Sequence, residues 1–512
     1  MEQNGLSFSE RLAERLGRWF LENRLPFLST LIAGLLAHAF VLTNKLPNHD
    51  DVSYLFNKGE TIRSGRWGLE LLRYVIPDIS MPWLHGITSL LLLAVSVCLI
   101  VRLFRIRSRL SQVLLSALII SFPSQTGTFC YMFTSSAYAV AFLFSVLAVW
   151  EARKPHWKHW LFSSFCIVLT FSIYQAYIPL TASLMILLLI RDILDAGSEN
   201  CALAVFKRGL LYLAILLIGL EVYRLTITFS LSFVGGEVNR YTNEAQYMAP
   251  KFPDGIAVAY RFFFYNLSSR YNMLIVSRLS RALHFLALAL TLAGLICSQI
   301  RSKNPANALM LLFCLAILPF GICCLYAVIY WNAIHTLVLY SYIALYVLMF
   351  IAIDELPRPV LLFSKDLLYA SLGIVLAINI CFANRTYMKL FLEYENAYSL
   401  ATTLVTQIRS LPGYNRDMEV AIYPSAGTAL SFAPEFGTKD ENDHDIMGVQ
   451  AQLLTGYTEE DFFRYYLGQE LNVLSREEAE DLYKDERVQA MPVYPDAGSI
   501  AIIDDVIFIR FA

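Results

Sequence analysis

Two adjacent carboxylates, Asp50 and Asp51, follow directly on the first long apolar run of the chain. Two carboxyl groups this close raise each other's pKa, which suits a general base that works near neutral pH. The segment HDDVSYLF also has the pattern of a capped interfacial helix. The apolar stripe of that helix would be Val52, Leu55, Phe56 and Ile62. The two interpretations are compatible, because one acid can cap the helix while its neighbour faces a cavity.

His49 and Tyr54 flank the acid pair, and Arg66 and Trp67 follow it in the same polar loop. A guanidinium recognises phosphate through two parallel hydrogen bonds. An indole stacks on a sugar ring, or it anchors at the headgroup level of a membrane. We predict that these four residues bind substrate, with interfacial anchoring as the alternative role of Trp67.

A second polar loop, residues 231–282, carries several arginines among many aromatic residues. Their spacing fits amphipathic helices at the outer leaflet rather than a membrane crossing. Arg240, Arg261 and Arg270 are candidates for binding the phosphate of a lipid-linked substrate. The alternative is that these arginines extend their charged ends toward lipid phosphates.

Glu221 and Arg224 are one helical turn apart inside an apolar segment. That spacing predicts an internal ion pair at membrane depth, and the pair would also fit the wall of a polar cavity. The sequence contains no glycine-rich nucleotide loop, no zinc motif and no nucleophilic elbow, so no cofactor is predicted. The acidic stretch KDENDHD could hold a divalent cation, but a solvated loop is the favoured interpretation.

The elements that position these residues are membrane helices. The chain has 512 residues, of which 57% are hydrophobic and 16% charged, whereas a soluble chain is about a quarter charged. Apolar runs close to the roughly 17–25 residues that cross the hydrocarbon core predict about eleven crossings. They lie at 26–43, 83–101, 110–122, 133–150, 160–173, 175–190, 208–230, 283–300, 306–328, 334–353 and 367–384.

The distribution of basic residues predicts the orientation of these crossings. With the N-terminus in the cytoplasm, every inside segment is basic, and the short outside loops at 123–132, 174 and 329–333 lack Lys and Arg. An odd number of crossings then places the polar tail outside, on the face that carries the acid pair. We therefore predict a transmembrane domain at 1–384 and an extracytoplasmic α+β domain at 385–512. The large outer loops of the former are 44–82 and 231–282.

The tail has local signals of both helices and strands. A polar helix runs up to Pro412-Gly413, and the segment EVAIYP that follows has the pattern of a strand. Ser475 and Glu478 have the spacing of a capping box. The segments SIAII and VIFIRF flank Asp504-Asp505, which predicts a β-hairpin.

An acid pair just outside the first transmembrane helix, followed in the same loop by Gly65, Arg66 and Trp67, resembles a known family. It is similar to the phage-type serotype-converting O-antigen glucosyltransferases, within the GT-C class of integral-membrane glycosyltransferases. The number of crossings, the large outer loops and the polar tail resemble that family as well. The resemblance implies a polyprenyl-phosphate-linked monosaccharide donor, commonly glucose, and Asp50 or Asp51 as the general base on the acceptor hydroxyl.

We therefore predict an inverting sugar transferase in the cytoplasmic membrane of a bacterium, acting on the outer face. Its partners would be the polyprenyl-phosphate sugar, a lipid-linked or cell-envelope glycan acceptor, and the lipid bilayer. Because the donor's lipid tail stays in the bilayer, the base must lie at the height of the outer interface. A transporter or flippase of a lipid-linked glycan is the alternative, but such a protein would show inverted repeats and interrupted helices near the midplane. No basic run could follow a phosphate backbone, so nucleic acid is not a partner.

Overall fold

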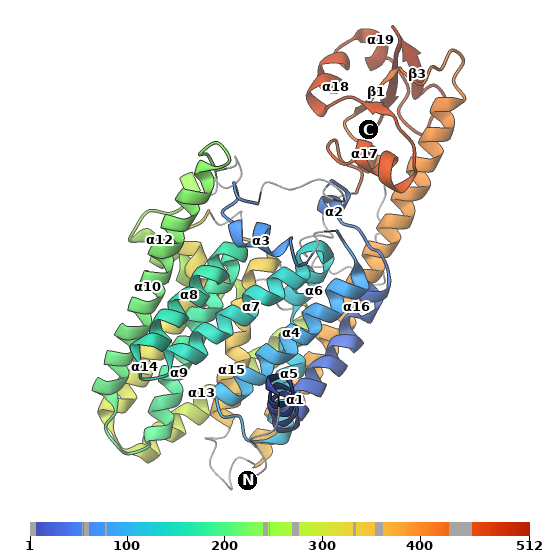
Figure 1. The fold of residues 1–512 in the computed structure, drawn as a ribbon. Helices are drawn as coiled ribbons and strands as arrows, with labels where there is room; N and C mark the ends of the chain where they lie inside the picture. The colour runs from blue at the N-terminus through green and yellow to red at the C-terminus, as the bar shows by residue number, and fades with distance from the viewer. Residues whose placement is uncertain are drawn as a thin grey trace.

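The protein is a bundle of long apolar helices that carries a small domain at one end (Figure 1). The computed structural model describes residues 7–53, 55, 61–76, 79–238, 244, 246–268, 276–330, 334–353, 362–429 and 453–512. Within these residues, nine helical segments are long and apolar enough to cross a membrane. The bent pair α5 (Arg109–Ile120) and α6 (Pro123–Cys130) brings the number to ten when it is counted as one span. The prediction of a polytopic membrane protein is confirmed.

The nine segments match nine of the predicted crossings. They are α1 (Phe8–Thr43), α4 (Pro82–Leu103), α7 (Met132–Ala152), η1 (Gln175–Tyr177) with α9 (Ile178–Ala196), α10 (Ala202–Ser232), α13 (Arg278–Ser302), α14 (Pro305–Cys323) with η2 (Cys324–Ala327), η4 (Thr336–Tyr342) with α15 (Ile343–Ile353), and α16 (Leu362–Arg409).

Two of the eleven predicted crossings are not among the nine segments. The crossing at 110–122 corresponds to the bent pair of α5 and α6, and the crossing at 160–173 corresponds to α8 (Trp157–Ile173). This helix has 17 residues, so it is only about 25 Å long at 1.5 Å per residue, which is the lower end of what spans a bilayer. It lies between α7 and α10 and packs against both.

The first helix begins well before the first apolar run. Ser7 and Glu10 form a capping box, in which each side chain accepts a hydrogen bond from the other's backbone N–H, and this satisfies donors that a helix start leaves unpaired. The side chains of the first turns of α1 are exposed. The last turns pack against α4, α5 and α16, which leads the chain to the end of the bundle at Thr43.

The end of the bundle that α1 reaches also carries two short helices and the C-terminal domain, while the N-terminus lies at the opposite end (Figure 1). The short helices are α2 (His49–Ser53) and α3 (Trp67–Leu72). A third helix, α12 (Asp254–Ser268), packs on α14 and η2. At 15 residues, α12 is shorter than a membrane crossing requires.

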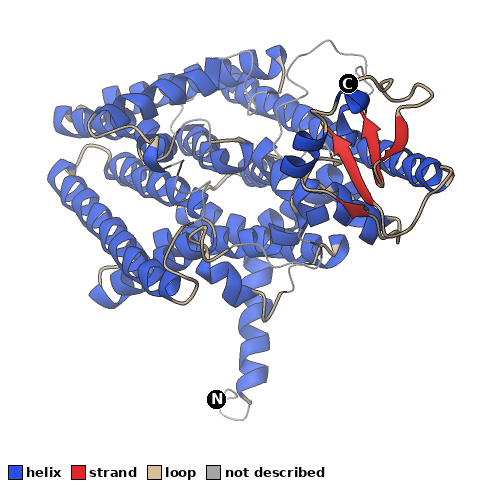
Figure 2. Ribbon diagram, turned by 90° about the horizontal axis from the view of Figure 1, so that it is seen from above, coloured by secondary structure: helices blue, strands red, loops and turns tan. Residues whose placement is uncertain are grey.

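The last helix connects the bundle to the C-terminal domain. At 48 residues, α16 is about 72 Å long, much longer than a bilayer is thick. It passes position 385 without a break and merges the last predicted crossing with the predicted polar helix. Its outer part packs against the tail, whose sheet stands at one side of the molecule (Figure 2).

The tail contains a four-stranded mixed sheet in the order β2-β1-β4-β3. The strands are β1 (Glu419–Tyr423), β2 (Asn472–Val473), β3 (Ile500–Ile503) and β4 (Val506–Arg510). The short helices around them are η5 (Ala426–Ala429), α17 (Glu459–Asp461), η7 (Phe462–Tyr466), α18 (Arg476–Leu482) and α19 (Glu486–Gln489). β1 pairs with β2 and β4 in parallel, and β3 pairs with β4 antiparallel. The predicted α+β character of the tail is confirmed, and the stretch KDENDHD lies outside the described residues.

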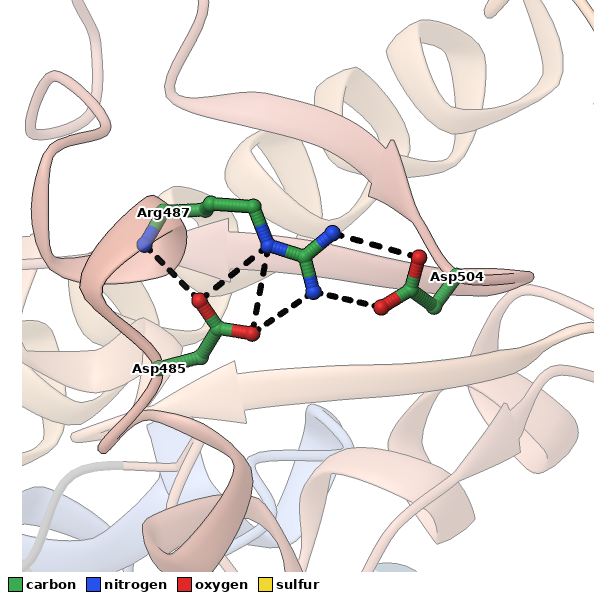
Figure 3. A network of polar contacts seen from close by, with 3 residues as sticks. All are labelled: Asp485, Arg487 and Asp504. Atoms are coloured by element: carbon green, nitrogen blue, oxygen red, sulfur yellow. Dashed lines mark hydrogen bonds and ion pairs between the residues drawn. The ribbon is translucent and has the colours of Figure 1, made fainter.

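Two local predictions in the tail are confirmed. Ser475 and Glu478 form the capping box of α18. Asp504 and Asp505, with φ of 50° and 62°, form the two-residue turn between β3 and β4, as a hairpin turn with positive φ at both central positions requires. The guanidinium of Arg487 lies between Asp485 and Asp504 and ties α19 to this turn (Figure 3).

Candidate functional site

A cavity of about 1140 Å³ lies near α2 and α3. Its polar lining comes from α2, both ends of α3, the start of α7, η1, α10 and the residue before η4. These polar side chains include His49, Asp50, Arg66, Tyr138, Gln175 and His335. The apolar lining comes from several elements, among them α3, α7, the C-terminal part of α10, the segment after α14, and η4. The residues from α10 and from the segment after α14 are Ile227, Leu231, Leu325, Val328 and Ile329. The cavity therefore offers both charged groups and an apolar surface.

The two acids of α2 have different surroundings. Asp50 lines the cavity, its side chain is 33% exposed, and its Oδ1 lies 3.6 Å from Nε2 of His49. Asp51 does not line the cavity, and its side chain is only 1% exposed. Its Oδ1 lies 3.5 Å from Nζ of Lys45. Only Asp50 is placed to meet a substrate in this cavity.

The capping role considered for the acids belongs to a different residue. The side chain of Asn48 accepts a hydrogen bond from the backbone N–H of Asp51 at 2.8 Å, which is an N-cap contact. The expected interfacial helix is also shorter than its pattern suggested, because α2 ends at Ser53. Val52, expected in an interfacial stripe, is fully buried among side chains of the C-terminal domain. Phe56 lies outside the described residues.

The electrostatics of Asp50 suit a proton acceptor. Burial raises the pKa of its carboxyl above the ordinary value, because desolvation disfavours the charged form. His49 and Arg66 act in the opposite direction, and the Asp51 carboxylate adds to the increase. Burial also lowers the pKa of the His49 imidazole, against the attraction of both acids. A carboxylate whose pKa is raised accepts a proton more readily than an ordinary aspartate, which suits a general base near neutral pH.

The turn before α3 holds the chain in one conformation next to the cavity. Gly65 has a φ of +79°, in the region that favours glycine. Its carbonyl oxygen accepts hydrogen bonds from the hydroxyl of Tyr223 at 2.8 Å and from Nε2 of Gln175 at 3.2 Å. A Cβ at this position would lie 2.7 Å from the Tyr223 hydroxyl. The turn is thus clamped by α10 and η1, and only glycine fits it.

The turn presents Arg66 to the cavity. The backbone N–H of Arg66 donates to the carbonyl of Thr61 at 2.8 Å. Nη1 donates to the hydroxyl of Tyr138 at 3.2 Å, and the guanidinium lies 5.4 Å from the ring centroid of Tyr174. The two tyrosine rings are stacked 3.9 Å apart. The hydroxyl and the aromatic face hold the guanidinium at the wall of the cavity.

Several predicted substrate-binding residues lie elsewhere. Trp67 begins α3 and does not line the cavity, and Arg261 is exposed on α12, also away from the lining. Tyr54, Arg240 and Arg270 lie outside the described residues. The structure therefore brings together His49, Asp50, Arg66 and Arg224 from the predicted set.

The predicted ion pair of α10 is present but is not internal. Arg224 Nη1 lies 3.2 Å from Glu221 Oε1, with the two side chains 67% and 61% exposed. The prediction of an internal pair is wrong because α10 lies at the edge of the bundle, where few of its side chains are buried. Arg224 still contributes to the lining of the cavity, whereas Glu221 does not.

Five residues that line the cavity were not predicted from the sequence, namely Tyr138, Tyr174, Gln175, Tyr223 and His335. One signal was available for Gln175. The predicted crossings at 160–173 and 175–190 leave a single residue between them, which is too short for a turn, so the polar YQAY segment had to form structure of its own. It forms η1. In His335, the buried Nδ1 has no hydrogen-bond partner among the described residues.

No group of three or more His, Cys, Asp or Glu side chains in the described part of the chain could hold a metal ion. Among the described residues, the cavity lining offers the carboxylate of Asp50, the guanidinium groups of Arg66, Arg73 and Arg224, and hydrogen-bonding side chains beside apolar ones.

Comparison with known proteins gives one match. The model of the family described as Glucosyl transferase GtrII matches residues 39–353. This range spans more than half of the chain and includes every residue that lines the cavity, whereas α16 and the C-terminal domain lie beyond it. None of the curated proteins and none of the solved structures matches the chain.

Proposed function

The chain belongs to the glucosyl transferase GtrII family, and we propose that it transfers glucose from a polyprenyl-phosphate donor to an O-antigen-like glycan. The reaction would take place on the outer face of the bacterial cytoplasmic membrane. The observation that carries this proposal is the position of Asp50 and Arg66 in one cavity whose remaining lining is largely apolar. Membership of a transferase family sets aside the alternative of a transporter.

The polar and the apolar parts of the cavity lining match the two parts of the donor, the sugar phosphate and the lipid chain. A cavity of about 1140 Å³ exceeds the roughly 300–1,000 Å³ of a typical small-molecule site, which leaves room for a sugar, a phosphate and the first isoprene units. Arg66 is the cation for the phosphate, because its planar guanidinium matches phosphate oxygens. The apolar side chains of α10 and of the segment after α14 would contact the lipid chain.

Asp50 is the general base in this proposal. Its carboxylate accepts the proton of the acceptor hydroxyl as that oxygen forms a bond to the anomeric carbon. The bond from the anomeric carbon to the phosphate oxygen breaks, and polyprenyl phosphate leaves with one more negative charge. Arg66 stabilises that charge, so no general acid is needed. One displacement from the face opposite the phosphate inverts the anomeric centre.

The adjacent acid provides the matched control for this assignment. We expect Asp50→Asn to abolish transfer in proteoliposomes supplied with polyprenyl-phosphate glucose and an O-antigen acceptor. Asp51→Asn keeps the cavity-facing carboxylate and should retain measurable transfer. Thermal unfolding in detergent checks that both variants are folded. Full activity of a folded Asp50→Asn variant, or loss confined to Asp51→Asn, would show that Asp50 is not the base.

A further inference from the structure

The helix that carries Asp50 is partly buried in the C-terminal domain. Val52 of α2 has no exposed surface. It belongs to the same buried apolar cluster as Ala397 of α16, Phe462 and Phe463 of η7, and Ile507 of β4. α2 also contacts η7 directly, and Figure 1 shows it beside the tail. A residue of the first outer loop therefore completes the core of a domain formed by the end of the chain.

Polar and aromatic contacts accompany this burial. The hydroxyl of Ser53 donates to the backbone carbonyl of Tyr457 at 3.5 Å. The rings of His49 and Tyr457 meet edge to face, with centroids 6.4 Å apart. On the side of the bundle, the amide of Asn48 donates to the carbonyl of Cys130 at 2.7 Å. The five-residue α2 is thus held between the membrane bundle and the C-terminal domain.

A single helical turn is not stable by itself, because fixing its backbone costs more than its few hydrogen bonds return. The orientation of α2 must come from its neighbours. We propose that the C-terminal domain positions the general base: by burying Val52 it fixes the rotation of α2 and so directs Asp50 into the cavity. This rests on the proposed role of Asp50. Val52 touches no substrate in this arrangement and is a positioning residue.

Two valines give a matched test. Val52 and Val488 are both fully buried, but Val488 lies in a separate cluster of the tail, with Tyr483 and Phe508, away from α2. Val52→Ala should lower turnover at saturating substrates by about ten- to a hundred-fold, the range expected when a reacting group moves by about 1 Å. The KM for the donor should stay unchanged, since Arg66 and the apolar lining are untouched. Val488→Ala removes the same two methyl groups and should keep wild-type turnover.

A second measurement tests the contact between α2 and the C-terminal domain without relying on the transfer reaction. In a Ser53→Cys/Tyr457→Cys variant, a short bifunctional thiol reagent should link positions 53 and 457, as detected by mass spectrometry of the peptides. The linked protein should retain its turnover, because the docked tail is the active arrangement. The cross-linking result does not depend on which acid is the base. It therefore distinguishes an error in the proposed contact between α2 and the C-terminal domain from an error in the proposed mechanism.

Three outcomes would overturn the proposal. They are a Val52→Ala variant as active as Val488→Ala, a folded protein in which positions 53 and 457 do not link, and a linked protein that has lost transfer. The last would mean that the tail must leave α2 during the reaction.

Discussion

Replacing Gly65 by alanine tests whether the turn before α3 positions Arg66. The substitution has two costs in the structure. Alanine at a φ of +79° is strained by about 1–2 kcal/mol. The new Cβ would also lie 2.7 Å from the Tyr223 hydroxyl and 2.9 Å from Nε2 of Gln175, which is too close for either group to stay in place.

The second cost can be worked out from the hydrogen bonds that the methyl group displaces. Tyr223 and Gln175 each donate to the Gly65 carbonyl, and a hydrogen bond of this kind contributes roughly 0.5–1.5 kcal/mol. Loss of both would cost about 1–3 kcal/mol beyond the backbone strain. If the turn shifts instead, Arg66 moves with it. If this free energy is lost from the stabilisation of the transition state, the transfer rate falls by about one to two powers of ten.

Gly413 is the matched control because it has a φ of +87° and nothing within 4 Å of its Cβ position. Gly413→Ala therefore has the backbone strain without the clash. Initial rates of glucose transfer at saturating donor, together with the apparent unfolding temperature in detergent, compare the two variants. We expect a large loss of rate only in Gly65→Ala. If both variants transfer glucose like the wild type, the clamped turn does not position Arg66.

Three further predictions concern the phosphate site, the pKa of the base and the side of the membrane on which the tail lies. Arg66→Lys keeps the charge but loses the planar fork of the guanidinium, so turnover at saturating donor should fall. In Arg66→Ala, turnover should fall further, by about one to two powers of ten for a lost charge-assisted hydrogen bond. Unchanged kinetics in Arg66→Ala would make the residue an interfacial anchor. The base acts only when ionised, and burial raises the pKa of Asp50, so transfer should fall on acidification at a pH above the ordinary range of an aspartate. Asp51→Asn removes a carboxylate that raises this pKa, so the acidic limb of the pH–rate profile should move to lower pH, and a shift to higher pH would contradict the assignment. Finally, a Lys484→Cys variant, at a position where the side chain is 72% exposed, should react with a membrane-impermeant thiol reagent in intact spheroplasts; labelling only after lysis would place the tail in the cytoplasm.

Features that depend on neighbouring residues were predictable from the sequence. The apolar runs gave the membrane helices, since each crossing satisfies its backbone within one segment. The capping box at Ser475 and the turn at Asp504-Asp505 are equally local, and the structure contains both. The difference at α16 has a local reason as well. Nothing between the last predicted crossing and the polar helix interrupts the α-helix, so the two form one element.

The architecture of the site depends on contacts between distant residues, which leave no periodic pattern in the sequence. Gln175 and Tyr223 hold the turn at Gly65 from 110 and 158 positions away. Considered alone, Gln175 is a polar residue at the end of an apolar run, and Tyr223 is an aromatic residue within another. The motif around Arg66 predicted a cation beside the acid pair, but the clamp that fixes the guanidinium required the fold. The same holds for Val52, whose apolar character suggested the membrane interface and whose neighbours belong to the other end of the chain.

The helical geometry of α2 explains why two adjacent acids cannot share one role. Successive residues of an α-helix are about 100° apart around its axis, so Asp50, Asp51 and Val52 face three different directions. Val52 is buried in the C-terminal domain, and Asp51 is buried beside Lys45, which leaves the cavity to Asp50. The buried Asp51 carboxylate still acts through space, because its charge raises the pKa of Asp50. In the proposed mechanism, Asp50 would meet the substrate, and Asp51 would raise the basicity of its neighbour.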